Sequence, residues 1–279
     1  MTLIAAYSYE PNRTVFVNDF RTTIVSKSTR TQSDNAFKFL DIGNQVGMYL
    51  AGDVTGWNII FERELPRLKC IKSENFIEEF INILREYAVS PTPIIDNGKH
   101  LKSLGFIIEK SSNSNKSFYI DYMQGNGASL IELEKNKVYL IGSGANIQGL
   151  EEHLNNDLSQ YISNPKRPSH QKEAYLVANI LERFISNYIE NLKDPLIYER
   201  KGISNVFAYG YVDRGFFQIC SYTEEKFGKN YNKFSFEKDK NADIVLIDKS
   251  NNVISKLSPL DKITSDKPVR VDPFNRENT

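Results

Sequence analysis

The second residue of the chain, Thr2, carries a hydroxyl group that could act as a nucleophile. A threonine hydroxyl reacts slowly until a base removes its proton, and the α-amine of the same residue can be that base at a chain terminus. An α-amine titrates at about pH 8, close to neutrality. Because Thr2 is small, removal of the initiator Met1 could expose it. The pattern predicts an amino-terminal nucleophile, although many proteins without this chemistry also begin with Met-Thr.

The elements that would position Thr2 begin with two pairs of short apolar segments. Residues 2–7 and 13–18 flank a turn-forming Glu-Pro-Asn, which predicts a hairpin of buried strands. Residues 38–42 and 46–51 form a second predicted pair across a Gly-Asn turn. A polar stretch at 26–35 separates the two pairs. Thr2 is therefore expected to open a strand inside a sheet.

Helical and strand patterns then alternate along the chain. We expect two helices, at residues 54–68 and 74–87, followed by four strands, at 104–109, 117–122, 129–133 and 137–141. Two further helices, at 145–162 and 171–192, are expected to precede two strands, at 204–212 and 216–220. This order lets two antiparallel sheets pack face to face, with a helix pair over each outer face. We therefore expect an α+β fold, a four-layer αββα sandwich, although periodicity alone leaves the number of layers open.

The chain is expected to hold one main domain and a C-terminal extension. Residues 1–222 contain the elements of the sandwich, and residues 268–279 are predicted to be a disordered tail. Between them, residues 223–267 are more polar but include three short strand patterns, at 233–237, 243–247 and 252–257. We expect this β-rich extension to pack on the main domain.

The composition directs attention to a local site. Lys plus Arg and Asp plus Glu are 35 each among 279 residues, so no net field attracts nucleic acid or an anionic membrane. Cys70 and Cys220 lie far apart without further ligands at metal-binding spacing, so we expect no metal and no disulfide framework. We find no apolar run of the roughly 18 residues that span a bilayer and no leader segment. These features predict a cytoplasmic protein without a cofactor.

Three sequence landmarks follow Thr2 at characteristic spacing. Asn-Asp-Phe-Arg at 18–21 closes the second predicted strand, Lys-Phe-Leu-Asp-Ile at 38–42 forms the third, and Ala-Gly at 51–52 precedes the first helix. With these landmarks the chain resembles the proteasome β subunits and their bacterial HslV-type and Anbu-type relatives over roughly residues 2–220. These proteins belong to the amino-terminal nucleophile hydrolases, so the resemblance implies the four-layer proteasome-type fold.

The resemblance implies a role for each landmark residue. Lys38 would place a cation near the nucleophilic hydroxyl, and Asp19, in an Asp-x-Arg element closed by Arg21, would keep that lysine charged and oriented. The backbone N–H of Gly52 would hold the oxyanion, because a residue without Cβ lets a substrate approach closely. The alternative is an ordinary ion pair between Asp19 and Lys38 and a plain strand-to-helix turn at Gly52.

Two later segments add predicted site residues. Gly142, Ser143 and Gly144 match a family turn whose serine hydrogen-bonds the terminal amine, and they could instead form an ordinary turn that caps a helix. Ser204 matches the serine of a family Asp-x-x-Ser element, whereas Lys201 replaces its aspartate. A cation at that position would lower the proton affinity of the amine.

Together these residues predict a threonine-type peptidase. The Thr2 hydroxyl would attack a peptide carbonyl, and water would release the resulting ester, with no metal or organic cofactor. The expected substrates are peptides or unfolded proteins, and the expected assembly is a homo-oligomeric ring or helix that encloses the sites. An ATP-dependent unfolding partner is not identified by any motif. The alternatives are an amidase that acts on small molecules and a catalytically silent scaffold, as proteasome α subunits are.

Overall fold

The fold is described by a computed structural model. It covers residues 2–10, 12–25, 30–33, 38–43, 45–96, 98–109, 112, 114–205, 207–220, 234–238, 244–248 and 253–256. Met1, the predicted tail at 268–279 and the connecting parts of the 223–267 extension lie outside these residues. In the part of the chain that the structure describes, no helix is both long and apolar enough to cross a membrane.

The first sheet holds the beginning of the chain. Its five antiparallel strands are ordered β10-β1-β2-β11-β12, with bounds β1 (Ile4–Glu10), β2 (Arg13–Asp19), β10 (Lys137–Ile141), β11 (Phe207–Asp213) and β12 (Phe216–Cys220). Nearly all residues of β1 and β2 are buried, because both faces of these strands are covered. This is why apolar residues run consecutively through the middle of each strand, as in Ile-Ala-Ala-Tyr and Val-Phe-Val, instead of alternating with polar ones.

The second sheet is an antiparallel meander. Its strands lie in chain order, β5-β6-β7-β8-β9, with bounds β5 (Phe39–Gly43), β6 (Val46–Gly52), β7 (His100–Glu109), β8 (Ser114–Met123) and β9 (Gly127–Glu132). The strand predicted at 104–109 in fact begins at His100, because His100 and the next three residues pair with the end of β8. This extension brings additional polar side chains into the sheet.

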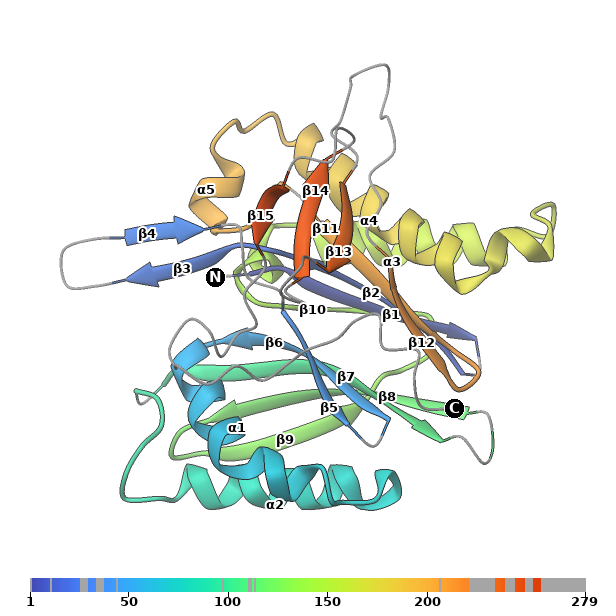
Figure 1. The fold of residues 1–279 in the computed structure, drawn as a ribbon. Helices are drawn as coiled ribbons and strands as arrows, with labels where there is room; N and C mark the ends of the chain where they lie inside the picture. The colour runs from blue at the N-terminus through green and yellow to red at the C-terminus, as the bar shows by residue number, and fades with distance from the viewer. Residues whose placement is uncertain are drawn as a thin grey trace.

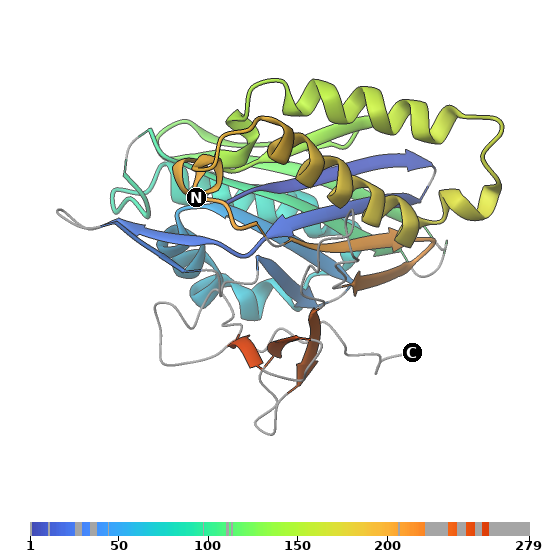
Figure 2. The same cartoon turned by 90° about the horizontal axis from the view of Figure 1, so that it is seen from above.

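The two sheets face each other across an aromatic layer, and helices cover their outer faces (Figures 1 and 2). Phe16 of β2 stacks on Tyr49 of β6 with ring centroids 5.1 Å apart, and Phe106 of β7 lies 5.8 Å from the Phe16 ring. Helices α3 (Leu150–Ser163) and α4 (Ala174–Asn191) lie over the first sheet, and α1 (Val54–Leu68) and α2 (Phe76–Ala88) over the second. The prediction of an α+β fold with two antiparallel sheets is confirmed.

The helix boundaries follow local capping chemistry. Asp53 begins α1 by accepting hydrogen bonds from the backbone N–H groups of Thr55 and Gly56, at 2.9 and 3.2 Å. The helix predicted from residue 145 begins only at Leu150, because Gly149 has a φ of 76°, which an α-helix cannot contain. Short 3-10 turns, which the periodicity did not predict, occupy η1 (Ser73–Asn75), η2 (Ser143–Asn146) and η3 (Ser169–Lys172).

Three further pieces of secondary structure complete the described chain. The polar stretch at 26–35 was interpreted as a separator, but β3 (Thr22–Val25) and β4 (Arg30–Ser33) pair as a hairpin that extends beyond the sandwich (Figure 1). A short helix, α5 (Ile197–Lys201), precedes β11 and was not predicted. The extension contains the predicted strands as one antiparallel sheet, β13 (Phe234–Lys238), β14 (Ile244–Asp248) and β15 (Val253–Lys256).

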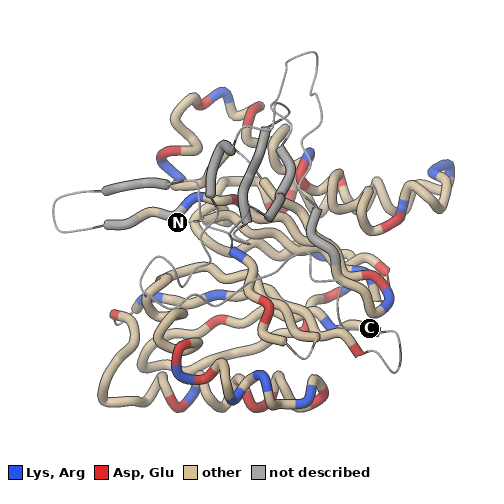
Figure 3. Tube along the Cα trace, in the orientation of Figure 1, with Lys and Arg blue, Asp and Glu red and all other residues tan. Residues whose placement is uncertain are grey.

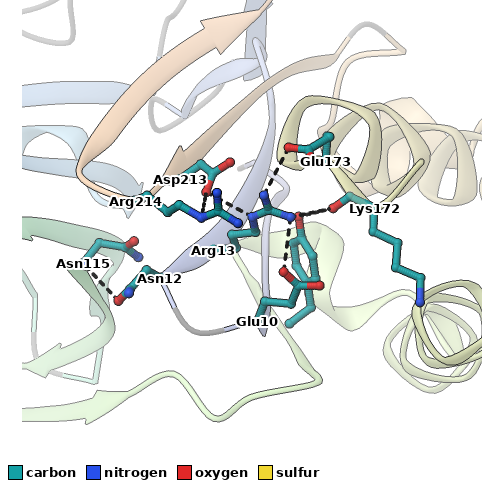
Figure 4. A network of polar contacts seen from close by, with 9 residues as sticks. Glu10, Asn12, Arg13, Asn115, Lys172, Glu173, Asp213 and Arg214 are labelled. Atoms are coloured by element: carbon teal, nitrogen blue, oxygen red, sulfur yellow. Dashed lines mark hydrogen bonds and ion pairs between the residues drawn. The ribbon is translucent and has the colours of Figure 1, made fainter. Parts of the chain in front are cut away.

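Charged residues of both signs are distributed along the outer helices (Figure 3). A basic residue at the start of β2, Arg13, lies inside the fold instead. The buried guanidinium of Arg13 contacts Glu10 at 3.1 Å, Glu173 at 3.1 Å and Asp213 at 3.0 Å, and it also bonds the Lys172 carbonyl at 3.2 Å (Figure 4). Arg13 therefore ties three strand ends to the segment that precedes α4.

Replacing Arg13 tests how much this network stabilises the fold. Arg13→Met should lower the free energy of unfolding by about 2 kcal/mol, less than for a fully buried pair because Glu10 and Glu173 reach solvent. Arg214, whose exposed guanidinium lies 3.7 Å from Asp213, supplies the matched control, and Arg214→Met should change stability by less than about 0.5 kcal/mol. Urea denaturation of both variants measures the difference, and equal effects would contradict a special role for Arg13.

Candidate active site

Thr2 lies just ahead of β1 and is held against the end of β2. The Thr2 hydroxyl donates a hydrogen bond to the carboxylate of Asp19. Strand pairing fixes this contact, because the N–H of Leu3 donates to the same carboxylate oxygen at 2.9 Å and the N–H of Asp19 donates to the Leu3 carbonyl at 3.0 Å. The backbone of the β1–β2 pair therefore points the hydroxyl at a carboxylate.

The Asp19 carboxylate is fully buried and accepts several hydrogen bonds. Its second oxygen receives the backbone N–H groups of Arg21 at 3.1 Å and Ser204 at 3.0 Å. Burial raises the pKa of Asp19, and the charge of Lys38 and the hydrogen bonds to the carboxylate act in the opposite direction. The surrounding donors and the Lys38 charge thus offset part of the cost of burying this carboxylate, and the pKa stays above its usual value.

Lys38 brings a buried cation to the same place from the second sheet. The residue precedes β5, and its carbonyl accepts the N–H of Leu50 at 2.9 Å, which fixes it beside β6. Its Nζ donates to the carbonyl of Arg21 at 2.7 Å, just beyond the end of β2. Because its charge also acts on Asp19, Lys38 connects the two sheets at the end where Thr2 lies. The predicted proximity of Lys38 and Asp19 is present.

Ser143 contacts the nitrogen of Thr2. The Ser143 hydroxyl oxygen accepts a hydrogen bond from this nitrogen at 3.1 Å, and its own proton can go to the carbonyl of Lys201 at 2.5 Å. The N–H of Gly144 donates to the Thr2 carbonyl at 3.0 Å. The turn after β10 therefore holds the backbone of Thr2 on both sides of its Cα atom.

The two glycines of this turn are required by close packing against the chain start. Gly142 has a φ of 86°, and a Cβ atom there would collide with the carbonyl of Thr2. A Cβ atom on Gly144 would lie 2.6 Å from the Cβ atom of Leu3. The Gly-Ser-Gly sequence thus serves to let β1 and the turn approach each other.

Lys201 and Ser204 contribute differently from what the sequence predicted. The Lys201 ammonium donates to the carbonyl of Asn146 at 2.9 Å, and the residue reaches Ser143 through its main-chain carbonyl. Ser204 receives the N–H of Phe20 at 3.1 Å on its hydroxyl and donates its own N–H to Asp19. Both residues support the neighbours of Thr2 through the backbone, which side-chain patterns in a sequence do not reveal.

Gly52 lies at the end of β6 in the second sheet and is exposed. Its φ is 100°, and a Cβ atom there would collide with the carbonyl of His100 in β7. The close approach of β7 therefore already requires a glycine at this position, whether or not its N–H binds an oxyanion. The sequence placed Arg21 in the landmark element without indicating its contacts, which include a backbone N–H to Asp19 and a carbonyl to Lys38.

No protein-family model and no curated protein matches this chain. The resemblance to proteasome β subunits therefore stays a prediction that depends on the residues described above. Within the residues that the structure describes, no group of three or more His, Cys, Asp or Glu side chains is arranged to hold a metal ion. The site must be interpreted from its own geometry, which joins a hydroxyl, a carboxylate, an ammonium group and a serine around one chain start.

Substitution of Gly142 tests the contact between the turn and Thr2. Gly142→Ala should reduce the free energy of unfolding by about 1–3 kcal/mol more than Gly125→Ala, because only the first methyl group collides with backbone. Gly125 is a matched control, since its φ of 81° imposes a similar backbone penalty and no atom lies within 4 Å of the position that an added Cβ atom would take. Urea denaturation followed by circular dichroism measures both. Equal losses would mean that Thr2 does not pack against Gly142.

Proposed function

We propose that this chain is a threonine-type amino-terminal nucleophile hydrolase that cleaves peptide bonds, with Thr2 as the nucleophile after removal of Met1. The observation that carries the proposal is the environment of Thr2, whose hydroxyl contacts Asp19 and whose nitrogen contacts Ser143. We also propose that the two sheets and their helices form the four-layer αββα fold of proteasome subunits. The order of the elements and the landmark residues support this fold.

The proposed reaction uses these groups in two steps. The Thr2 oxygen attacks the peptide carbonyl carbon, its proton passes to the α-amine, and the leaving amine takes that proton as the C–N bond breaks. Water then attacks the ester and restores the threonine. The buried Lys38 ammonium favours the deprotonated hydroxyl, Asp19 orients both groups, and the backbone N–H of the exposed Gly52 holds the oxyanion.

The energetic cost of the arrangement supports a functional interpretation. A buried ammonium requires compensation by nearby acceptors, and a pair of apolar side chains of similar size is often as stable. Lys38 nevertheless lies buried beside Asp19, within the same group of contacts as the Thr2 hydroxyl. Lys38 and the Thr2 hydroxyl also stabilise the Asp19 charge. Backbone N–H groups can do the same without burying an ammonium group, so the presence of a lysine here favours a functional role.

A catalytically silent scaffold of the same fold is the second candidate. The observation that favours it is the burial of Thr2, which is 3% exposed in the described structure. A hydroxyl that substrates cannot reach would only hold the chain start in place. A small-molecule amidase lies between the two candidates, since a compact substrate needs less access than a peptide does. The distinction depends on whether Thr2 becomes a reactive terminus.

Replacing Thr2 tests the nucleophile directly. Thr2→Ala should abolish peptide hydrolysis and covalent labelling by a peptide epoxyketone, while Thr2→Ser should retain both because it keeps a hydroxyl. Intact-mass measurement of the protein should find a chain shorter by Met1. Retention of Met1 in every active preparation, or hydrolysis that persists in Thr2→Ala, would reject the proposed mechanism.

We further propose that the chain assembles into a closed ring or a helical array through its outer helices. An unselective nucleophile needs an enclosed space to protect other proteins, and head-to-tail contacts form rings when their rotation closes. The zero net charge opposes association only weakly. Light scattering at micromolar concentration should detect an oligomer of more than two chains. A strictly monomeric protein would contradict the compartment and favour the small-molecule amidase.

A further inference from the structure

A second cluster of titratable side chains lies on β7 and β8, outside the group around Thr2. The carboxylate of Asp121 is its centre. One oxygen lies 2.6 Å from Nδ1 of His100, and the other lies 3.4 Å from Nζ of Lys102 and accepts the hydroxyl of Tyr119 at 3.0 Å. Both carboxylate oxygens are thus occupied from within the cluster.

Strand geometry places this cluster on the face that looks toward the first sheet. Side chains alternate along a strand, so Lys102 shares a face of β7 with Phe106, four residues later. Phe106 lies 5.8 Å from Phe16 of the first sheet, which identifies this face as the inner one. The cluster is nevertheless accessible, because the side chains of His100 and Lys102 remain 36% and 35% exposed.

The cluster lies at the same end of the second sheet as the candidate active site. Lys102 pairs with Ala51 in the strand register, directly before Gly52. Lys38 is fixed beside Leu50 of β6, so the strand of Lys102 is the second one along the sheet from Lys38. Two strand spacings are roughly 10 Å, which an extended peptide covers in about three residues.

The chemistry of the cluster favours a ligand that accepts hydrogen bonds. Burial, with Asp121 as a further cause, raises the pKa of Tyr119, so the phenol keeps its proton and donates it to the carboxylate. A lysine ammonium has three N–H donors, and Asp121 is near only one side of it. Beyond the cluster, Asp53 at the start of α1 lies 3.8 Å from Lys99, which also pairs with Asp96 at 2.7 Å. The partly exposed Lys102 ammonium is therefore the group of the cluster through which a ligand carboxylate can be bound.

A purely structural interpretation is that the cluster only joins β7 to β8. The same two strands carry another cross-strand ion pair at their opposite end, where Lys116 lies 3.0 Å from Glu109. Exposed pairs of this kind contribute little to stability. The Lys116 pair therefore provides a matched comparison, since it has similar chemistry far from the candidate active site.

We propose that Lys102, held in place by Asp121 together with His100, forms a subsite that binds the carboxylate of a substrate, so that the preferred peptides carry an acidic side chain about three residues from the cleaved bond. The distance of the acidic side chain from the cleaved bond rests on the proposed function. Binding of that side chain by Lys102 does not require catalysis, because a peptide can bind to an inactive protein.

Binding to the Thr2→Ala protein tests the subsite separately from hydrolysis. Three fluorescein-labelled peptides that differ only in having Glu, Gln or Lys at one position are titrated and followed by anisotropy. The Glu peptide should bind about fivefold more tightly than the Gln peptide, as expected for one charged contact. Lys102→Gln should remove this preference, Lys102→Glu should reverse it toward the Lys peptide, and Lys116→Gln should retain it.

Each outcome has a defined meaning. Equal binding of the three peptides, or a Glu preference that survives in folded Lys102→Gln, overturns the subsite. Lys102→Met, which keeps the length of the side chain, replaces Lys102→Gln if circular dichroism finds that variant unfolded. A wild-type protein that binds the Glu peptide preferentially but never cleaves it supports the subsite and rejects only the proposed hydrolase. Cleavage without any charge preference rejects only the subsite.

Discussion

Asp19 ends a central strand with its carboxylate fully buried, and such a charge is tolerated only when neighbouring groups donate hydrogen bonds to it. The backbone of Leu3, Arg21 and Ser204 supplies these donors from three separate segments. The chain start, the end of β2 and the entry to β11 therefore meet at one point. Thr2 and Lys38 are positioned by the same meeting point, since the Thr2 hydroxyl bonds to Asp19 and the Lys38 ammonium bonds to the carbonyl of Arg21.

The order of strands and helices could be predicted from apolar spacing, because most elements are long and buried on a regular face. The hairpin of β3 and β4 could not, since β4 is entirely polar and β3 has only two adjacent apolar residues, which form no periodic pattern. The start of β7 was missed for a related reason. His100 and Lys102 are polar, and only the register with β8 identifies them as strand residues.

The candidate site could be predicted where a side chain makes the contact, and not where the backbone does. The neighbourhood of Thr2, Asp19 and Lys38 followed from landmark residues at familiar spacing. The contact between the Lys201 carbonyl and Ser143 did not, because it depends on how α5 packs beside η2. A residue type restricts which chemistry is available, whereas tertiary contacts determine which atom supplies it.

The hydrogen bond from Lys38 to the carbonyl of Arg21 also closes the base of a chain excursion, the segment that contains β3 and β4. Because this contact fixes both ends of the segment, the number of residues in the segment does not affect how Lys38 lies relative to Asp19. The entropy of closing a flexible loop grows only with the logarithm of its length. Insertions and deletions in this segment can therefore accumulate during evolution, or be engineered, without displacing either residue at its base.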